Sequence, residues 1–136
     1  MVDTNRVIRD YLVSRPALIA LVSTHIYAAN PLPQNATLPC ISFFTRGGTS
    51  IPAVPTIVIP SVQFSCWADD PIEAREIYRA LYDELNGLYD ANVTIDGTIY
   101  WIMRAIEEVQ GQDLQDTDIP KYWRVLTFYA ITIRNF

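Results

Sequence analysis

The segment from Ser61 to Gly87 constrains the fold of this chain more than any other, because a half-buried strand pattern leads directly into a capped amphipathic helix. Along Ser61–Trp67 the side chains alternate between two faces, which is typical of a strand with one buried face. The apolar face consists of Val62, Phe64 and Cys66. A strand that turns at once into a docked helix is expected to form the nucleus of the fold.

Three residues mark the start of that helix. Asp70 suits the N-cap position, where its carboxylate accepts a hydrogen bond from an unpaired backbone N–H. Pro71 follows at the first helical position, and Glu73 at the third completes a capping box. The helix is expected to run from 71 to about 86 and to stop at Gly87, which tolerates the left-handed conformation. Its apolar stripe is Ile77, Leu81, Leu85 and Leu88, extended on one side by Tyr78 and Tyr82.

Two shorter helices are expected near the N-terminus. Asp3 and Thr4 can cap the first, whose apolar stripe is Val7, Ile8, Tyr11 and Leu12. Pro16 disfavours a helical conformation in the residue before it, so this helix should end near Ser14. The same proline suits the first turn of a second helix over Ala17–Val22.

Strand patterns occur on both sides of the central helix. Ile26–Tyr27 and Cys40–Thr45 precede it, and strand structure resumes at Val58 or Ile59. Pro60 interrupts that strand, which suggests an edge position or a bulge. Each of these segments is short, so they predict strands of one sheet rather than separate domains.

A hairpin is predicted after the central helix. Asp96-Gly97 is a strong turn signal between Val93–Ile95 and a second strand that starts at Ile99 and ends at Met103 or Ile106. The stretch that follows, 107–119, is polar and turn-forming, so a loop is expected there.

The last strand pattern, Tyr122–Arg134, carries apolar residues on both faces. This favours a central strand that is covered on both sides for part of its length. The whole chain, residues 1–136, is therefore expected to be a single α+β domain. Its sheet should be antiparallel or mixed, with the helices packed on one face and a long β-hairpin arm.

The arm is the segment from Arg46 to Pro55, which is long for a connection between two strands. Its glycines predict mobility, its prolines limit strand pairing, and its apolar residues lie on a stretch expected to be exposed. Two interpretations remain open: the loop folds back over its own sheet, or it docks on a neighbouring subunit. The candidate interaction residues are Arg46, Gly47, Gly48, Ile51, Pro52, Val54 and Pro55.

The composition is that of a globular protein with an excess of acid. Half of the residues (50%) are hydrophobic, the formal net charge is −5 and the isoelectric point is about 4.6. This balance argues against a conventional nucleic-acid binder, although it is compatible with a surface past which DNA slides. Cys40 and Cys66 are expected to be buried, reduced thiols, with a disulfide as the lesser alternative. No signal peptide or membrane-spanning run is expected from the sequence.

Residues for catalysis or metal binding do not group in the sequence. His25 is the only histidine, and pairing it with either cysteine would require a nucleophile inside a predicted strand. Glu107 and Glu108 are adjacent, so on a strand they would point to opposite faces. An acidic stretch without the spacing of a calcium loop contains Asp113, Asp116 and Asp118. The sequence therefore predicts no enzyme, no cofactor and no metal site.

Taken together, several segments resemble the tail-completion or tail-terminator proteins of long-tailed bacteriophages. The likeness lies in a strand that ends in a tryptophan and acidic residues, and in a helix with an Ala-Arg-x-Ile core that ends near Leu-x-Gly. It continues in an early strand followed by a proline-rich loop, and in the closing strand. The segments are Trp67–Asp70, Ala74–Ile77, Leu85–Gly87, Ile26–Tyr27, Leu38–Phe43 and Tyr122–Phe128.

The resemblance implies a structural virion protein, made in the host cytoplasm and located in the neck region of the tail. Members of that family form a homo-oligomeric ring, a hexamer, which caps the tail tube and stops its polymerisation. The implied partners are the tail tube protein and the head-completion or stopper protein, while DNA passes through the lumen without specific binding. Alternatives are a small α+β binding or accessory module, and another neck or connector protein of the head–tail interface.

Overall fold

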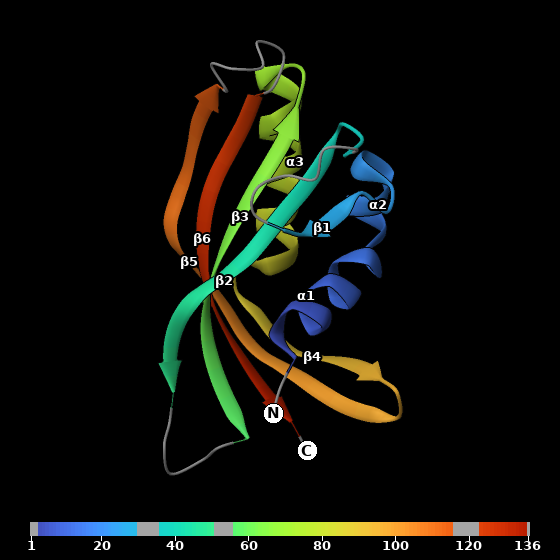
Figure 1. The fold of residues 1–136 in the computed structure, drawn as a ribbon, viewed down its shortest axis with the longest axis vertical. Coiled ribbons are helices and arrows are strands. Elements are labelled where there is room, and N and C mark those ends of the chain that lie inside the picture. Colours follow the sequence, from blue (N-terminus) through green and yellow to red (C-terminus); the bar gives the residue numbers. More distant parts are fainter. Residues whose placement is uncertain (1–2, 30–35, 51–55, 116–122, 136) are drawn as a thin grey trace.

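The computed structural model describes residues 3–29, 36–50, 56–115 and 123–135. Within these ranges the chain forms three helices and six strands, shown in Figure 1. The helices are α1 (Thr4–Val13), α2 (Pro16–Val22) and α3 (Pro71–Leu85). The strands are β1 (Ile26–Ala28), β2 (Cys40–Ser50), β3 (Ile57–Ala68), β4 (Leu88–Ile95), β5 (Thr98–Gln115) and β6 (Trp123–Asn135).

The strands form one mixed sheet in the order β1-β2-β3-β6-β5-β4. β1 runs parallel to β2, and each other pair of neighbours is antiparallel. The predicted α+β class and the central position of β6 are confirmed, since β6 lies between β3 and β5.

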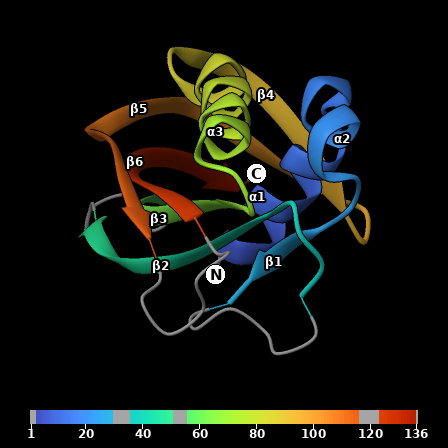
Figure 2. The ribbon, with the colours of Figure 1, turned by 90° about the horizontal axis from the view of Figure 1, so that it is seen from above.

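The sheet curls around the helices, as Figure 2 shows from above. α3 packs on β3, β6 and β5, while α1 contacts β1 and β2 at one edge of the sheet and β4 at the other. Because α1 reaches both edges, the helices and one face of the sheet enclose a single core. A row of aromatic rings crosses its centre: the centroid of Phe64 lies 5.6 Å from that of Phe43 and 5.7 Å from that of Tyr129.

The predicted unit of strand and capped helix is present as β3 and α3. The Asp70 carboxylate accepts a hydrogen bond of 2.9 Å from the backbone N–H of Ile72, and Pro71 is the first helical residue. The helix ends at Leu85, two residues before Gly87, which has a φ of +78° and donates its N–H to the carbonyl of Ala105 at 3.0 Å. The buried stripe is Ala74, Ile77, Tyr78, Leu81 and Leu85, while Leu88 opens β4 instead of extending the helix.

The two N-terminal helices are also confirmed. Asp3 caps α1, its carboxylate accepting a hydrogen bond of 3.3 Å from the backbone N–H of Arg6. α1 ends at Val13, and Pro16 is the first residue of α2. The local proline and capping rules therefore suffice to define both boundaries.

Both strands of the second hairpin are longer than predicted. β4 begins at Leu88 rather than at Val93, and β5 continues to Gln115. The expected loop over 107–119 is therefore wrong for residues 107–115. Register shifts in the pairing of β5 with β6 around Glu107 and Gln112 explain why the sequence shows no simple alternation there.

The polar residues of this half of β5 are bound by α3. The Tyr78 hydroxyl donates to the Glu107 carboxylate at 2.6 Å and accepts from the Gly111 N–H at 3.1 Å. Burial and the hydrogen bond to Glu107 raise the pKa of Tyr78, so the hydroxyl keeps its proton at neutral pH. Arg75 adds an ion pair of 2.8 Å to Asp113. These contacts hold a polar stretch in the sheet that sequence polarity alone assigns to a loop.

The second face of the sheet differs from the expectation. β6 was predicted to be covered on both sides, but each described helix packs on the face that carries Val62 and Phe64. On the opposite face the side chains of β6 remain only half-buried. No helix in the described part of the chain is long and apolar enough to cross a membrane.

Candidate assembly interface

The β2–β3 hairpin extends beyond the helices, at the lower left of Figure 1. Strand β2 includes Arg46, Gly47 and Gly48, and Gly48 pairs with Pro60 of β3. The prediction that these three residues belong to a loop at the tip is therefore wrong. The other candidate interaction residues, Ile51, Pro52, Val54 and Pro55, lie outside the described residues. The docking role of the arm stays a prediction, but its base belongs to the sheet.

A bulge explains the two glycines in the strand. The register of β2 on β3 shifts between Thr45 and Gly48, and Gly48 pairs with Pro60. Gly48 has a φ of +139°, and a Cβ there would lie 2.2 Å from the carbonyl oxygen of Ile59. Of the two expectations for Pro60, the bulge is confirmed and the edge position is wrong, because β3 lies inside the sheet.

Arg46 binds the outer face of its own sheet, the face without helices. Its Cζ lies 4.0 Å from the centroid of the Phe128 ring, and its Nε donates to the Ser61 hydroxyl at 3.1 Å. The Ser61 hydroxyl in turn donates to the Glu108 carboxylate at 2.8 Å. This chain crosses β6 at Ala130, which pairs with Ser61 and has too small a side chain to block it. The base of the arm is thereby tied to β5 and β6.

The outer face combines apolar and basic side chains. The outward residues of β6 alternate with buried ones and are Arg124, Leu126, Phe128, Ala130 and Thr132. Phe44 of β2 and the exposed Ile106 and Val109 of β5 add apolar surface. Although the chain has a net charge of −5, this face carries arginines, whereas many of the acids lie on or beside the helices. The arginines are Arg46, Arg104, Arg124 and Arg134.

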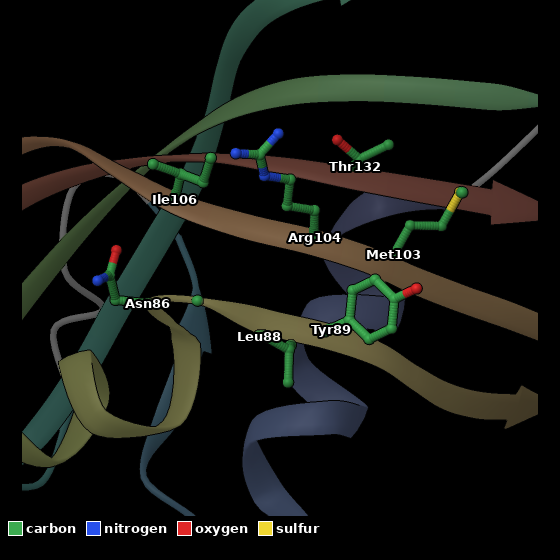
Figure 3. A pocket seen from close by; sticks show the side chains of 8 residues that line it. Asn86, Leu88, Tyr89, Met103, Arg104, Ile106 and Thr132 are labelled. Atoms are coloured by element: carbon green, nitrogen blue, oxygen red, sulfur yellow. The ribbon is translucent and has the colours of Figure 1, made fainter.

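A groove lies where β4 and β5 meet on this face, beside the end of α3 (Figure 3). It has a volume of about 620 Å³ and is lined by Leu88, Tyr89, Met103, Arg104, Ile106 and Thr132, together with the end of α3. Tyr89 is 81% exposed, and Ile106 is 38% exposed. Large apolar side chains held this open to solvent on rigid strands are typical of an interaction surface.

Arg104 supplies the charge of the groove. It pairs with Tyr89 across the β4–β5 ladder and with Thr132 across the β5–β6 ladder. Among the described residues, no carboxylate lies within ion-pair distance of its guanidinium. An apolar groove whose cation lacks a carboxylate partner in the described part of the chain favours an occupant that is apolar at its centre and acidic at its rim.

Groups suited to catalysis are dispersed. Within the described ranges, no cluster of histidine, cysteine and acidic side chains could hold a metal ion. As predicted, Glu107 and Glu108 point to opposite faces: Glu107 accepts from Tyr78 under α3, and Glu108 accepts from Ser61 on the outer face. Neither carboxylate can therefore act together with the other.

Both cysteines are free and buried, as predicted. Burial raises the pKa of Cys40 to about 12, and it raises the pKa of Cys66 as well. The thiols are protonated at neutral pH, so they lack the thiolate that a nucleophile or a metal ligand requires.

The sequence-based prediction missed the groove. Its β5 residues lie within the strand that the sequence predicts from Ile99 to Met103 or Ile106, but the partner strand was predicted to begin only at Val93, and Leu88 was assigned to the stripe of the helix. The available signal was the set of apolar residues within polar stretches, namely Tyr89, Ile106 and Val109. Without the strand pairing, nothing in the sequence places them on one face.

Comparisons with known proteins bear on the fold. No protein-family model matches the chain, and no curated protein matches it either. Among solved structures, the fold is similar to that of a chain in the "Virion of native gene transfer agent (GTA) particle". The TM-score is 0.61 at 16% sequence identity, and the likeness covers 96% of this chain and 93% of that chain. The similarity thus extends over nearly the full length of both chains and concerns the fold.

Proposed function

We propose that this protein is a structural component of a phage-like virion and forms a ring at the head-proximal end of the tail tube. The ring would end tube polymerisation and join the tail to the head-completion proteins. The observation that carries the proposal is the shared fold with a chain of a gene transfer agent virion, which covers 96% of this chain. The position in the neck comes from the resemblance of the sequence segments to tail-terminator proteins.

The surface of the protein supports an assembly role. A virion subunit needs apolar surface that is exposed before assembly and covered after it. The outer face and the groove provide such surface on rigid strands, with Tyr89 at 81% exposure. The proposed partners are further copies of the chain, the tail tube protein and the head-completion protein.

The charge balance is compatible with DNA transit through a ring. A net charge of −5 per subunit repels phosphate on average, so DNA would pass without being retained. No catalytic step is part of the proposed role.

The groove also favours a second candidate, a small binding or accessory module. Its volume of about 620 Å³ lies within the range of small-molecule sites. Ligand sites of that kind bury most of the ligand, however, whereas this groove is bounded by strongly exposed side chains. A third candidate, another neck or connector protein, would use the same surfaces at a different level of the particle.

Deletion of the gene from its parent genome tests the proposal. Without a terminator, tube polymerisation has no stop, so electron microscopy should show tails of uncontrolled length and heads without tails. A plasmid-borne wild-type gene should restore normal particles, and mass spectrometry should find the protein in them.

The alternatives give different results. Tails of normal length that fail to join heads would favour another neck or connector protein. Normal particles that lack the protein would contradict any virion role and favour the binding module.

A further inference from the structure

The first turn of α3 presents an apolar side chain within a group of acids. Ile72 is 70% exposed, an unusual position for a large aliphatic residue on an otherwise amphipathic helix. Four carboxylates lie near it in the sequence: Asp69 and Asp70 before the helix, Glu73 in the first turn and Glu76 in the second. We call Ile72 and these four acids the knob.

Among the described residues, no ion pair joins a cation to the acids of the knob. Partial burial and, after it, the neighbouring carboxylates raise the pKa of Glu73. The nearest cation along the helix, Arg75, is turned toward β5, where it pairs with Asp113 at 2.8 Å and donates to the Gly111 carbonyl at 3.1 Å. Arg79 lies about two turns beyond Ile72 and lines a hollow beside Glu107. The knob is thus an apolar tip with an acidic rim.

The groove between β4 and β5 has the complementary character. Its apolar walls include Tyr89, Met103 and Ile106, and its cation, Arg104, has no carboxylate partner among the described residues. Figure 3 shows Arg104 and Met103 on β5 and Tyr89 on the adjacent β4. An aliphatic tip between these side chains would bury apolar surface on both sides, and an acidic rim beside Arg104 would pair opposite charges.

We propose that the knob of one copy of this protein docks into the β4–β5 groove of the next copy. The inference rests on the proposed ring and names the two surfaces through which its subunits meet. Knob and groove belong to different parts of the subunit, so the contact is head-to-tail and repeats from one copy to the next. Such a contact generates a ring when its rotation closes.

Charge disfavours the symmetric pairings. Two grooves facing each other would bring Arg104 against Arg104, and two knobs would bring four carboxylates against four. Only the knob-to-groove pairing joins opposite charges while it covers both exposed apolar sites. This is why a second copy of the chain is the occupant that fits.

Two single variants of the full chain break one surface each. Ile72→Asp destroys the knob and leaves the groove, whereas Arg104→Glu destroys the groove and leaves the knob. Both positions are exposed, so circular dichroism should show that the fold of each subunit is unchanged. Leu21→Asp on α2 is the matched control, since Leu21 is an exposed apolar residue outside both surfaces.

Sedimentation velocity of the purified proteins provides the decisive measurement. Wild type and Leu21→Asp should sediment as the same oligomer, and each of the two variants should sediment as a monomer, with its dissociation constant raised by about 100-fold or more. An equimolar mixture of the two variants should form a heterodimer and nothing larger. One working knob and one working groove remain in that mixture, and they allow a single contact.

A charge exchange adds a gain of function. Combining Glu73→Arg and Glu76→Arg with Arg104→Glu in one chain should restore oligomers, because the two surfaces again carry opposite charges. Neither half of the exchange should assemble alone.

Two outcomes would overturn the inference. A wild type that remains monomeric up to high concentration contradicts docking between copies. The occupant of the groove would then be a different protein, such as the tube protein. An Ile72→Asp variant that still forms the wild-type oligomer shows that the subunits meet elsewhere. Neither result decides the virion role, which the tail-length experiment tests separately.

Discussion

Replacing Gly111 by alanine should destabilise the protein, although the substitution is usually favourable in a strand. Gly111 lies within β5, and its φ is outside the left-handed region, so alanine suits the backbone. The gain from a stiffer unfolded chain and a better strand former is about 0.5–1 kcal/mol. This gain is outweighed because neighbouring side chains already occupy the space that the added methyl group would need.

An added Cβ would meet two side chains at once. It would lie 2.7 Å from Cζ of Tyr78 and 2.7 Å from Cγ1 of Val125, both well inside normal contact distance. Tyr78 cannot simply swing away, because its hydroxyl donates to Glu107 at 2.6 Å and accepts from the Gly111 N–H at 3.1 Å. Overpacking of this kind costs about 1–3 kcal/mol, and loss of the hydrogen bond costs about 1 kcal/mol more. After the gain is subtracted, the net loss should be about 1–3.5 kcal/mol.

Urea unfolding measures this loss as a lower midpoint at an unchanged slope. Gln110→Ala, at the exposed neighbouring position, should stay within about 0.5 kcal/mol of wild type. Tyr78→Leu removes the crowded ring, so the double variant Gly111→Ala/Tyr78→Leu should be more stable than the two single losses predict. A Gly111→Ala protein as stable as wild type, or a strictly additive double variant, would refute the packing explanation.

Three further outcomes follow from other parts of the fold. Gly48→Ala should cost about 1–3 kcal/mol in the same assay, because it places a Cβ 2.2 Å from the Ile59 carbonyl at a φ of +139°; a loss below 0.5 kcal/mol would contradict the bulge. Leu81→Ala should cost about 2–5 kcal/mol, since Leu81 is fully buried under α3, and a minor change would show that the stripe of α3 is not core. Cys40 and Cys66 should resist alkylation at pH 8 in the folded protein and react promptly in urea. Alkylation of the native protein as fast as that in urea would contradict the burial. Because burial raises the pKa of Cys40 from 9 to about 12, the unfolded chain releases the thiol proton at a lower pH than the folded protein does. The contribution of Cys40 to the free energy of unfolding should therefore fall as the pH rises from about 9 to 12.

Local signals in the sequence determined the β3–α3 unit and both N-terminal helices. Asp70, Pro71 and Gly87 act on the backbone within one turn of their own position, so their effects can be read without knowing any distant contact. Alternation along 61–67 is equally local, and it identified the buried face of β3 correctly. From these elements the α+β class could be predicted, whereas the central place of β6 was predicted from the apolar residues on both faces of its own strand pattern.

Contacts between distant residues decided the remainder of the sheet. Residues 107–115 are polar, yet they form a strand because Tyr78 and Arg75, far away in the sequence, bind them from α3. The two glycines of the arm were predicted to make it mobile, yet Gly48 lies in a bulge whose geometry depends on the facing Pro60. A single strand pattern contains neither partner.

The candidate interface, too, could be predicted only in part from the sequence. The sequence determined that the chain has surplus apolar residues, an acidic balance and no grouped chemistry. It could not place Tyr89 beside Arg104, or Phe128 under Arg46, because each pair arises from strand pairing and register. Register is set by the whole sheet, and a shift of one residue would turn each of these side chains to the opposite face. Only the tertiary structure therefore decided that apolar residues such as Tyr89, Ile106 and Val109 were left exposed on one face.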